Sequence, residues 1–199
     1  MSKESKPLPP SGATILMIVL IPAIAALNYV TSAIVTITKI PAFLDTWATS
    51  FGTLVAGLYV GAAGGFLYNI VMALTLWGLP SWPWGFINVY IAVMTWFFDR
   101  IGWMDIKKPL KVIAGGLIIG FLNTFACTLV SYVFFGLLPT WANAYGMATY
   151  SIALGATGNM FIASWFSSLS VELYDKTIAQ FIAVLIASAV PKRFILKKS

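Results

Sequence analysis

The amino-acid sequence predicts an all-α membrane protein with six transmembrane helices and a long irregular outer segment before the last helix. Hydrophobic residues make up 60% of the 199 residues and charged residues 9%, whereas soluble domains have about 45–50% and about 25%. The mean hydropathy is +0.90. At about 20 residues per span, this length allows roughly six helices and no sizeable soluble domain.

The expected elements follow the apolar runs in order. Residues 1–12 are polar and contain prolines, so we expect a disordered cytoplasmic tail. The membrane domain covers residues 13–193, and the basic residues 194–199 form a second cytoplasmic tail. Small residues at 61–65 favour a tight turn between the second and third spans. The predicted spans are residues 13–37, 46–60, 62–79, 85–98, 110–135 and 173–190.

The stretch before the last span allows two interpretations. Residues 140–168 are apolar but are interrupted by glycines and by Asn143 and Asn159. They form either a re-entrant segment over a cavity or a further span. The last span would then open at Glu172 and Asp175, whose carboxylates complement a helix N-terminus and are expected to be structural. In this interpretation no charged residue lies deep within a span.

The basic residues orient the six-span arrangement. With the N-terminus inside, every lysine and arginine except Lys39 and Lys176 falls in a cytoplasmic segment. This distribution follows the positive-inside rule and predicts that both termini are cytoplasmic. The formal charge of +6 is explained by basic ends beside anionic lipid headgroups. We therefore expect membrane lipids as partners and no nucleic acid.

The residue inventory argues against an enzyme. The chain has no histidine, which removes imidazole catalysis and histidine-ligated metals. Its single cysteine, Cys127, lies in an apolar run and is expected to be a small buried hydrophobe. No Walker A sequence is present, so any ATP-driven process depends on a partner. We expect no catalytic residue, no cofactor and no metal.

Aromatic and amide side chains gather in segments that this topology places outside. Stacking rings with convergent amides suit a flat small molecule, although an interfacial aromatic belt also explains each tryptophan taken singly. Asp45 either caps the second span or contacts the ligand. The candidate substrate-binding residues are Asp45, Trp47, Trp84, Asn88, Asn123, Trp141, Asn143, Tyr145, Asn159 and Trp165.

Three segments of the chain form a pattern in a fixed order. They are Leu44-Asp45-Thr46 with the small-residue run 57–65 and Asn69, the run from Trp84 to Asn88, and Glu172-Leu-Tyr-Asp175-Lys176 before an apolar span ending in Pro191-Lys192-Arg193. Together with the chain length, the six expected spans and the basic ends, these segments resemble the substrate-binding S components of energy-coupling factor (ECF) vitamin transporters.

The resemblance implies a six-helix protein of a bacterial or archaeal cell membrane that captures a vitamin or related micronutrient from outside. Its partners would be an ECF scaffold transmembrane subunit and two cytoplasmic ATPases, and the whole S component would topple in the bilayer to carry the substrate inward. The first span would dock on the scaffold through small residues, here Ala23, Ala25 and Ala26, with bulkier residues at positions 27, 29 and 30.

The ligand and the class of function stay open at this point. Aromatic and amide side chains favour a ring-bearing vitamin of the pyridine, pyrimidine or flavin type, and the larger cobalamin also remains a candidate. Two other classes of protein are alternatives. One is a multi-span membrane ligand sensor, although no signalling domain follows Lys198 in the sequence. The other is a lipid-modifying membrane enzyme, for which acid–base groups are scarce.

Overall fold

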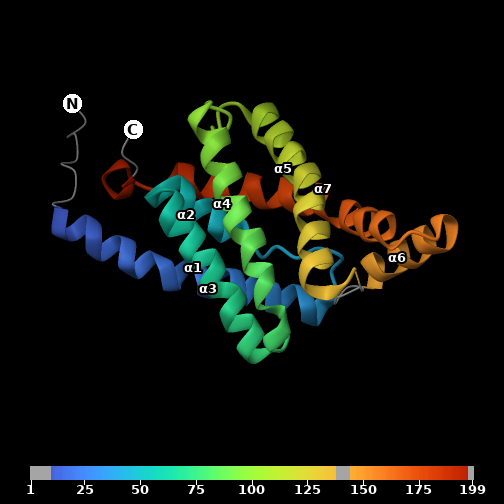
Figure 1. Cartoon of the computed structure of the whole chain (residues 1–199). Coiled ribbons are helices and arrows are strands. Elements are labelled where there is room, and N and C mark those ends of the chain that lie inside the picture. Colours follow the sequence, from blue (N-terminus) through green and yellow to red (C-terminus); the bar gives the residue numbers. More distant parts are fainter. Residues whose placement is uncertain (1–9, 138–143, 197–199) are drawn as a thin grey trace.

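The computed structural model describes residues 10–137 and 144–196, and within these ranges the chain is helical and contains no strand (Figure 1). The all-α class is therefore confirmed. Two 3-10 helices, η1 (Leu79–Trp84) and η2 (Lys192–Phe194), accompany the α-helices. The α-helices are α1 (Pro10–Thr38), α2 (Trp47–Ala56), α3 (Leu58–Thr75), α4 (Gly85–Arg100), α5 (Pro109–Phe135), α6 (Ala144–Thr157) and α7 (Met160–Ala189).

Three of the described helices are long and apolar enough to cross a membrane. They are Gly12–Thr38 within α1, α3 and α5. Large apolar side chains are exposed along these helices, for example Ile18 of α1 at 63% and Leu129 of α5 at 60%. Exposed apolar surface of this extent is not stable against water, so it marks contact with a membrane or a partner. These features are compatible with a multi-pass membrane protein.

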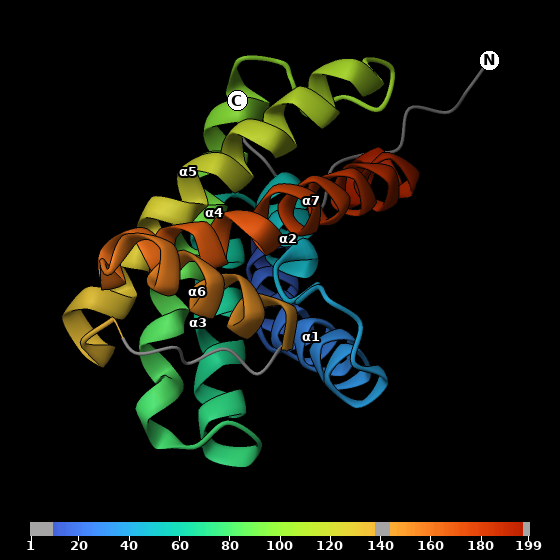
Figure 2. The same ribbon diagram turned by 90° about the vertical axis from the view of Figure 1, so that its right-hand side faces the viewer.

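The short helix α2 lies at the centre of the bundle, between α1 and α7 in Figure 2. It also packs against α3 and α4. The chain turns from α2 into α3 at Gly57, whose φ of 96° is readily adopted only by glycine. The turn predicted at 61–65 is therefore wrong, because these residues lie inside α3.

The glycines of α3 serve close helix packing instead of a turn. A Cβ atom on Gly64 would lie 2.7 Å from the side chain of Ile24, on α1. One on Gly65 would lie 2.8 Å from the side chain of Asn88, on α4. Without these Cβ atoms the neighbouring helices approach closely, which is the usual reason for small residues between packed membrane helices.

The last helix differs most from the sequence-based expectation. In place of an irregular outer segment and a span beginning near residue 173, α7 runs without a break over 30 residues. The Asn159 side chain caps it by accepting hydrogen bonds from the backbone N–H groups of Phe161 and Ile162. Residues 144–157 form α6, so only residues 138–143 of the expected irregular segment lie outside the described ranges.

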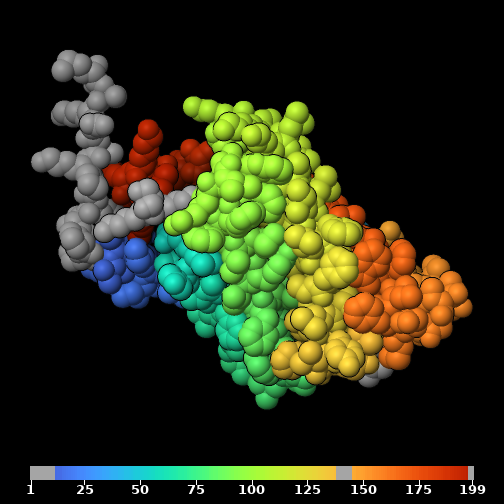
Figure 3. All heavy atoms as spheres, turned by 45° about the horizontal axis from the view of Figure 1, so that its top comes forward, coloured from blue at the N-terminus to red at the C-terminus, as the bar shows by residue number. Residues whose placement is uncertain are grey.

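Helix α7 packs most extensively against α5. Gly116 and Gly120 on α5 make this possible, because Cβ atoms there would lie 2.7 Å from Cα of Thr177 and 2.5 Å from the carbonyl oxygen of Glu172. In Figure 3, α6 projects beyond α5, at the end of the molecule away from α1. The pairing of α5 with α7 places the middle of α7 inside the protein.

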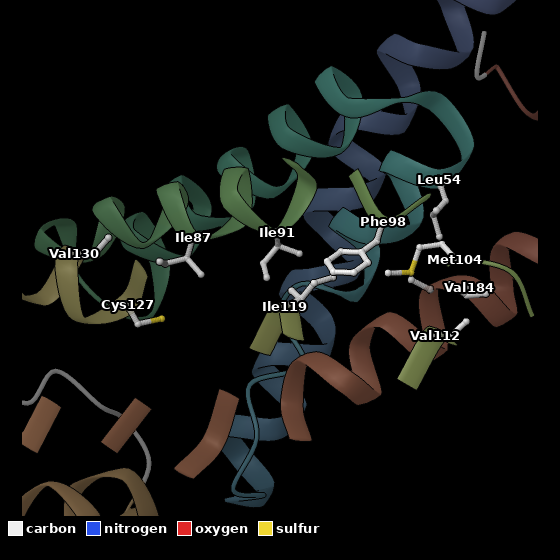
Figure 4. Close-up of a cluster of buried hydrophobic side chains, with 11 residues drawn as sticks. Leu54, Ile87, Ile91, Phe98, Met104, Val112, Ile119, Cys127, Val130 and Val184 are labelled. Atoms are coloured by element: carbon white, nitrogen blue, oxygen red, sulfur yellow. The ribbon is translucent and has the colours of Figure 1, made fainter. Parts of the chain in front are cut away.

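The largest apolar cluster lies along α4, α5 and α7 (Figure 4). Cys127 and Val130 mark one end of the row, and Val112 and Val184 mark the other. Fully buried Ile119 lies between them. The end that contains Cys127 adjoins the cavity described next.

Candidate functional site

A cavity of about 310 Å³ lies between the 39–46 connection, η1, α4, α5 and α7. Its volume falls at the lower end of the range of about 300–1,000 Å³ for small-molecule sites. Aromatic side chains form much of its wall, and carboxylates and an ammonium group form its polar side. The lining residues are Phe43, Asp45, Trp77, Pro80, Ser81, Trp84, Ile87, Cys127, Phe135, Glu172 and Lys176.

The polar side of the cavity is a cluster of three carboxylates around one lysine. We call these four residues, Asp45, Glu172, Asp175 and Lys176, the charged cluster. The Lys176 Nζ atom lies 2.7 Å from Asp175 Oδ2, 3.2 Å from Glu172 Oε2 and 3.3 Å from Asp45 Oδ1. The Lys176 side chain is 2% exposed and the Asp45 side chain 14%. Burying charges at this density is costly unless they are paired, so the four residues depend on one another.

Asp175 has a structural task within the charged cluster. Its Oδ1 atom accepts hydrogen bonds from the backbone N–H groups of Phe43 and Leu44, both at 2.8 Å. Leu44 has a positive φ of 46°, so the connection makes a sharp turn here. Asp175 thus fixes the segment that carries Phe43 and Asp45 against α7, and its other oxygen is taken by Lys176.

Glu172 is held from the side of α5. Asn123 donates a hydrogen bond from Nδ2 to Glu172 Oε2 at 2.8 Å, and the Cys127 thiol lies 3.6 Å from Glu172 Oε1. Both α5 residues are buried. These contacts orient the Glu172 carboxylate without adding a positive charge, so its charge is balanced through Lys176 alone among its described partners.

The apolar side of the cavity is built from rings. Trp84 stacks on Phe135 with a centroid distance of 5.4 Å and an interplanar angle of 12°. The Phe43 ring faces the Lys176 ammonium at 5.8 Å. Trp77 contributes a buried indole N–H that has no hydrogen-bond partner in the described part of the chain. A flat ligand can therefore stack on the rings that line the cavity.

Asp45 lies in the connection between α1 and α2. Burial raises the pKa of its carboxyl above the ordinary value; the Lys176 ammonium opposes this shift and the Asp175 carboxylate adds to it. The residue at the N-terminus of α2 is Thr46, which makes no side-chain capping hydrogen bond. The Asp45 side chain lines the cavity and contacts Lys176 there.

The structure distributes the candidate binding residues over several environments. Asp45 and Trp84 line the cavity, and Asn123 lies behind Glu172. Asn88 is buried and accepts a hydrogen bond from Thr49, so it joins helices. Trp141 and Asn143 lie outside the described residues. The remaining four do not line the cavity. Trp47 donates a hydrogen bond to Thr31 Oγ1, and Tyr145 is 50% exposed on α6. Asn159 caps α7, and Trp165 packs among Phe121, Phe125 and Phe166.

The sequence interpretation missed the main polar residues of the cavity, Glu172 and Lys176. It placed them in the first turn of the last span, whereas they lie in the middle of α7 and are buried. The expectation that these residues open a helix is therefore wrong. The signal was a spacing of four residues that places polar side chains on one helix face, namely Ser164, Ser168, Glu172, Lys176 and Gln180.

The three docking candidates on α1 do not share one environment. Ala25 is 5% exposed and packs in a cluster with Tyr68 and Met72, so it faces the interior. Ala26 is exposed, and Ala23 is half-buried. Of the three, Ala26 is the residue available to a partner on the outer surface of α1.

A larger hollow of about 800 Å³ lies between α5, α6 and α7. Its lining consists of apolar side chains with a few hydroxyls, for example Leu117, Phe166 and Thr177, and contains no charged residue among those described. Its described lining therefore offers no charged group to pair with a charged ligand. The described residues also hold no set of three or more histidine, cysteine or acidic residues arranged for a metal ion.

Comparisons of the chain with protein-family models, curated protein sequences and solved structures find no match. The functional argument therefore depends on the cavity itself. Its geometry supports reversible binding of a small ring-bearing molecule: rings for stacking, carboxylates for hydrogen bonds, and a buried lysine that holds them in place.

Proposed function

We propose that this chain is the substrate-binding membrane subunit of an ECF-type ABC importer, which captures a small ring-bearing vitamin or related micronutrient from outside for ATP-driven uptake. The observation that carries the proposal is the cavity of about 310 Å³ with aromatic walls and the charged cluster at its side. Its size supports a pyridine- or pyrimidine-type ligand better than the larger cobalamin.

The position of the cavity is consistent with capture from the outer side. In the proposed topology, six helices lie in the membrane and both termini are cytoplasmic. Helix α2, with 10 residues in place of the expected span 46–60, crosses only part of the membrane's thickness. The 39–46 connection, η1 and the end of α5 then lie outside, and these are segments that border the cavity. Helix α6 would lie at the same outer side. The basic 101–108 connection would be cytoplasmic, as the positive-inside rule requires.

Cysteine labelling tests this topology. In a Cys127→Ala background, Lys107→Cys should react only from the cytoplasmic side and Trp82→Cys only from outside. External labelling of Lys107→Cys in sealed cells would contradict the proposed orientation.

Affinity purification and uptake test the proposed function. Tagged chain expressed in its native cells should co-purify with a scaffold membrane subunit and two ATPases, and uptake in proteoliposomes should require ATP hydrolysis by these partners. An ATPase variant that cannot hydrolyse ATP is the matched control, because it should preserve assembly and abolish uptake. Ligand binding without any co-purified ATPase would favour a lone sensor, and turnover of a lipid by this chain alone would favour an enzyme.

A further inference from the structure

We infer that the cavity is built for a positively charged ring-bearing ligand: an aromatic nitrogen heterocycle with a permanent positive charge, or one bearing a protonated amine. This inference rests on the proposed function and names the chemical class of its substrate. It follows from the charge of the cavity and the character of its walls.

The charged cluster carries more negative than positive charge. Three carboxylates surround Lys176, and no second cation is present among the described residues that line the cavity. With all four groups ionised, the formal charge is three negative and one positive, a net of −2. Asp175 is satisfied by backbone N–H groups and by Lys176, so the excess falls on the two carboxylates that line the cavity, Asp45 and Glu172.

A cationic ligand removes this imbalance. A positive charge placed beside Asp45 and Glu172 would neutralise carboxylates that are held away from water, where charge interactions are stronger than in bulk solvent. An anionic ligand would have to compete with three carboxylates for the single ammonium group of Lys176. The same site that attracts a cation therefore repels a carboxylate or phosphate.

The walls favour a cation for an independent reason. Trp77, Trp84, Phe43 and Phe135 present aromatic rings to one small volume. The face of an aromatic ring carries partial negative charge and attracts cations, and groups of such rings recognise quaternary ammonium ligands. The Phe43 ring already faces the ammonium of Lys176 at 5.8 Å. The remaining rings can stack on a flat cationic heterocycle. The expected ligand therefore combines a positive charge with a flat aromatic ring.

Three pyridine probes of the same ring size test the inference: 1-methylnicotinamide (cation), nicotinamide (neutral) and nicotinate (anion). Calorimetric titration of the full-length purified protein should rank them in this order, with the cation binding at least tenfold more tightly than the anion. Equal or tighter binding of nicotinate would overturn the cationic class while leaving the cavity as a ring site. Absence of binding by all three at millimolar concentration would overturn the cavity as a ring site, and with it this inference.

The Glu172→Gln variant identifies the source of the preference. It should lower the affinity for 1-methylnicotinamide at least tenfold, about 1.4 kcal/mol, and change the affinity for nicotinamide less than threefold. The small change for nicotinamide would also show that the cavity has kept its shape. Asp105→Asn, in the distant α4–α5 connection, is the matched control and should change neither. An equal loss for the charged and neutral probes in Glu172→Gln would contradict the electrostatic account. Co-purification of ATPases is unaffected by either result, so the proposed function is judged separately.

Discussion

Two of the buried polar regions among the described residues differ in character. The first, which we call the neutral junction, joins Asn28 of α1, Thr49 of α2 and Asn88 of α4. Asn28 donates to Thr49 at 2.9 Å, and Thr49 donates to Asn88 at 2.6 Å. The second is the charged cluster on α7 and the 39–46 connection. Both regions consist of side chains that are costly to bury in an apolar bundle unless they are paired.

The two regions differ in whether their polar groups are all paired within the region. In the neutral junction, amide and hydroxyl groups satisfy one another, and the backbone N–H of Ala48 completes the set by donating to Asn28. None of its three side chains lines the cavity. The charged cluster has an excess of carboxylates and opens on a cavity. The neutral junction therefore holds helices together, whereas the charged cluster is the proposed ligand site.

The largest expected effect comes from removing the central cation of the charged cluster. Lys176→Met leaves three carboxylates without their counter-charge and should lower the free energy of unfolding by about 3–5 kcal/mol. Thermal unfolding in detergent measures this change. Lys107→Met, on an exposed connection, is the control and should have little effect. A loss below about 1 kcal/mol for Lys176→Met would mean that the cluster is not ionised as described.

A substitution in the neutral junction should lower the free energy of unfolding but leave ligand affinity unchanged. Thr49→Val keeps the side-chain shape and removes the hydroxyl that connects Asn28 to Asn88, which should lower the free energy of unfolding by about 1–3 kcal/mol. Thr75→Val, at an exposed position of α3, is the matched control. A change of more than tenfold in ligand affinity for folded Thr49→Val would show that the two regions are not separate.

Two tryptophan variants compare the cavity with an aromatic cluster outside it. Trp84→Ala removes the ring that stacks on Phe135 and should weaken a ring-bearing ligand about ten- to a hundredfold, because both stacking and buried area are lost. Trp165→Ala removes a ring that packs among phenylalanines away from the cavity and should leave affinity unchanged. Calorimetric titration with 1-methylnicotinamide compares the affinities of the two variants. The reverse pattern would move the site toward α6.

The smallest expected effect is on pH dependence, and it belongs to the charged cluster alone. Burial holds the pKa of Asp45 above its ordinary value, so the protonated form persists to higher pH than in a free aspartate. Asp45 faces Lys176, Glu172 and Asp175 of α7, and Tyr68 of α3.

Protonated Asp45 no longer attracts a cation, so affinity for 1-methylnicotinamide should rise with pH through the pKa of Asp45, by less than tenfold per pH unit. Asp45→Asn should flatten this part of the profile. A profile that falls with rising pH would contradict a cation-binding site.

The sequence predicted the fold class and most helices because each depends on local composition. The expected spans 85–98 and 110–135 correspond closely to α4 and α5, since apolar runs bounded by Pro, Gly and charged residues define helix ends locally. The break between α2 and α3 was misplaced, because five small residues at 61–65 look like a turn in sequence and act as packing contacts in space.

The site was only partly predictable. Asp45 and Trp84 were recognised by residue type and position. Glu172 and Lys176 were not, because the last span was expected to begin at residue 173 whereas α7 begins at Met160, and a charge at a helix start has a different meaning from one in its middle. The pairing of Asp45 with Lys176 joins residues that are 131 positions apart. Such a contact depends on helix packing, which a single sequence does not specify.

Mass spectrometry of the small molecules released from purified protein tests most directly whether the charged cluster, and not the neutral junction, forms the substrate site. Wild-type, Glu172→Gln and Thr49→Val proteins would be purified from the same cells. We predict a ring-bearing cation in amounts near one per protein from wild type and Thr49→Val, and its loss from Glu172→Gln. Equal recovery from Glu172→Gln and wild type, or release of an anion, would contradict the account.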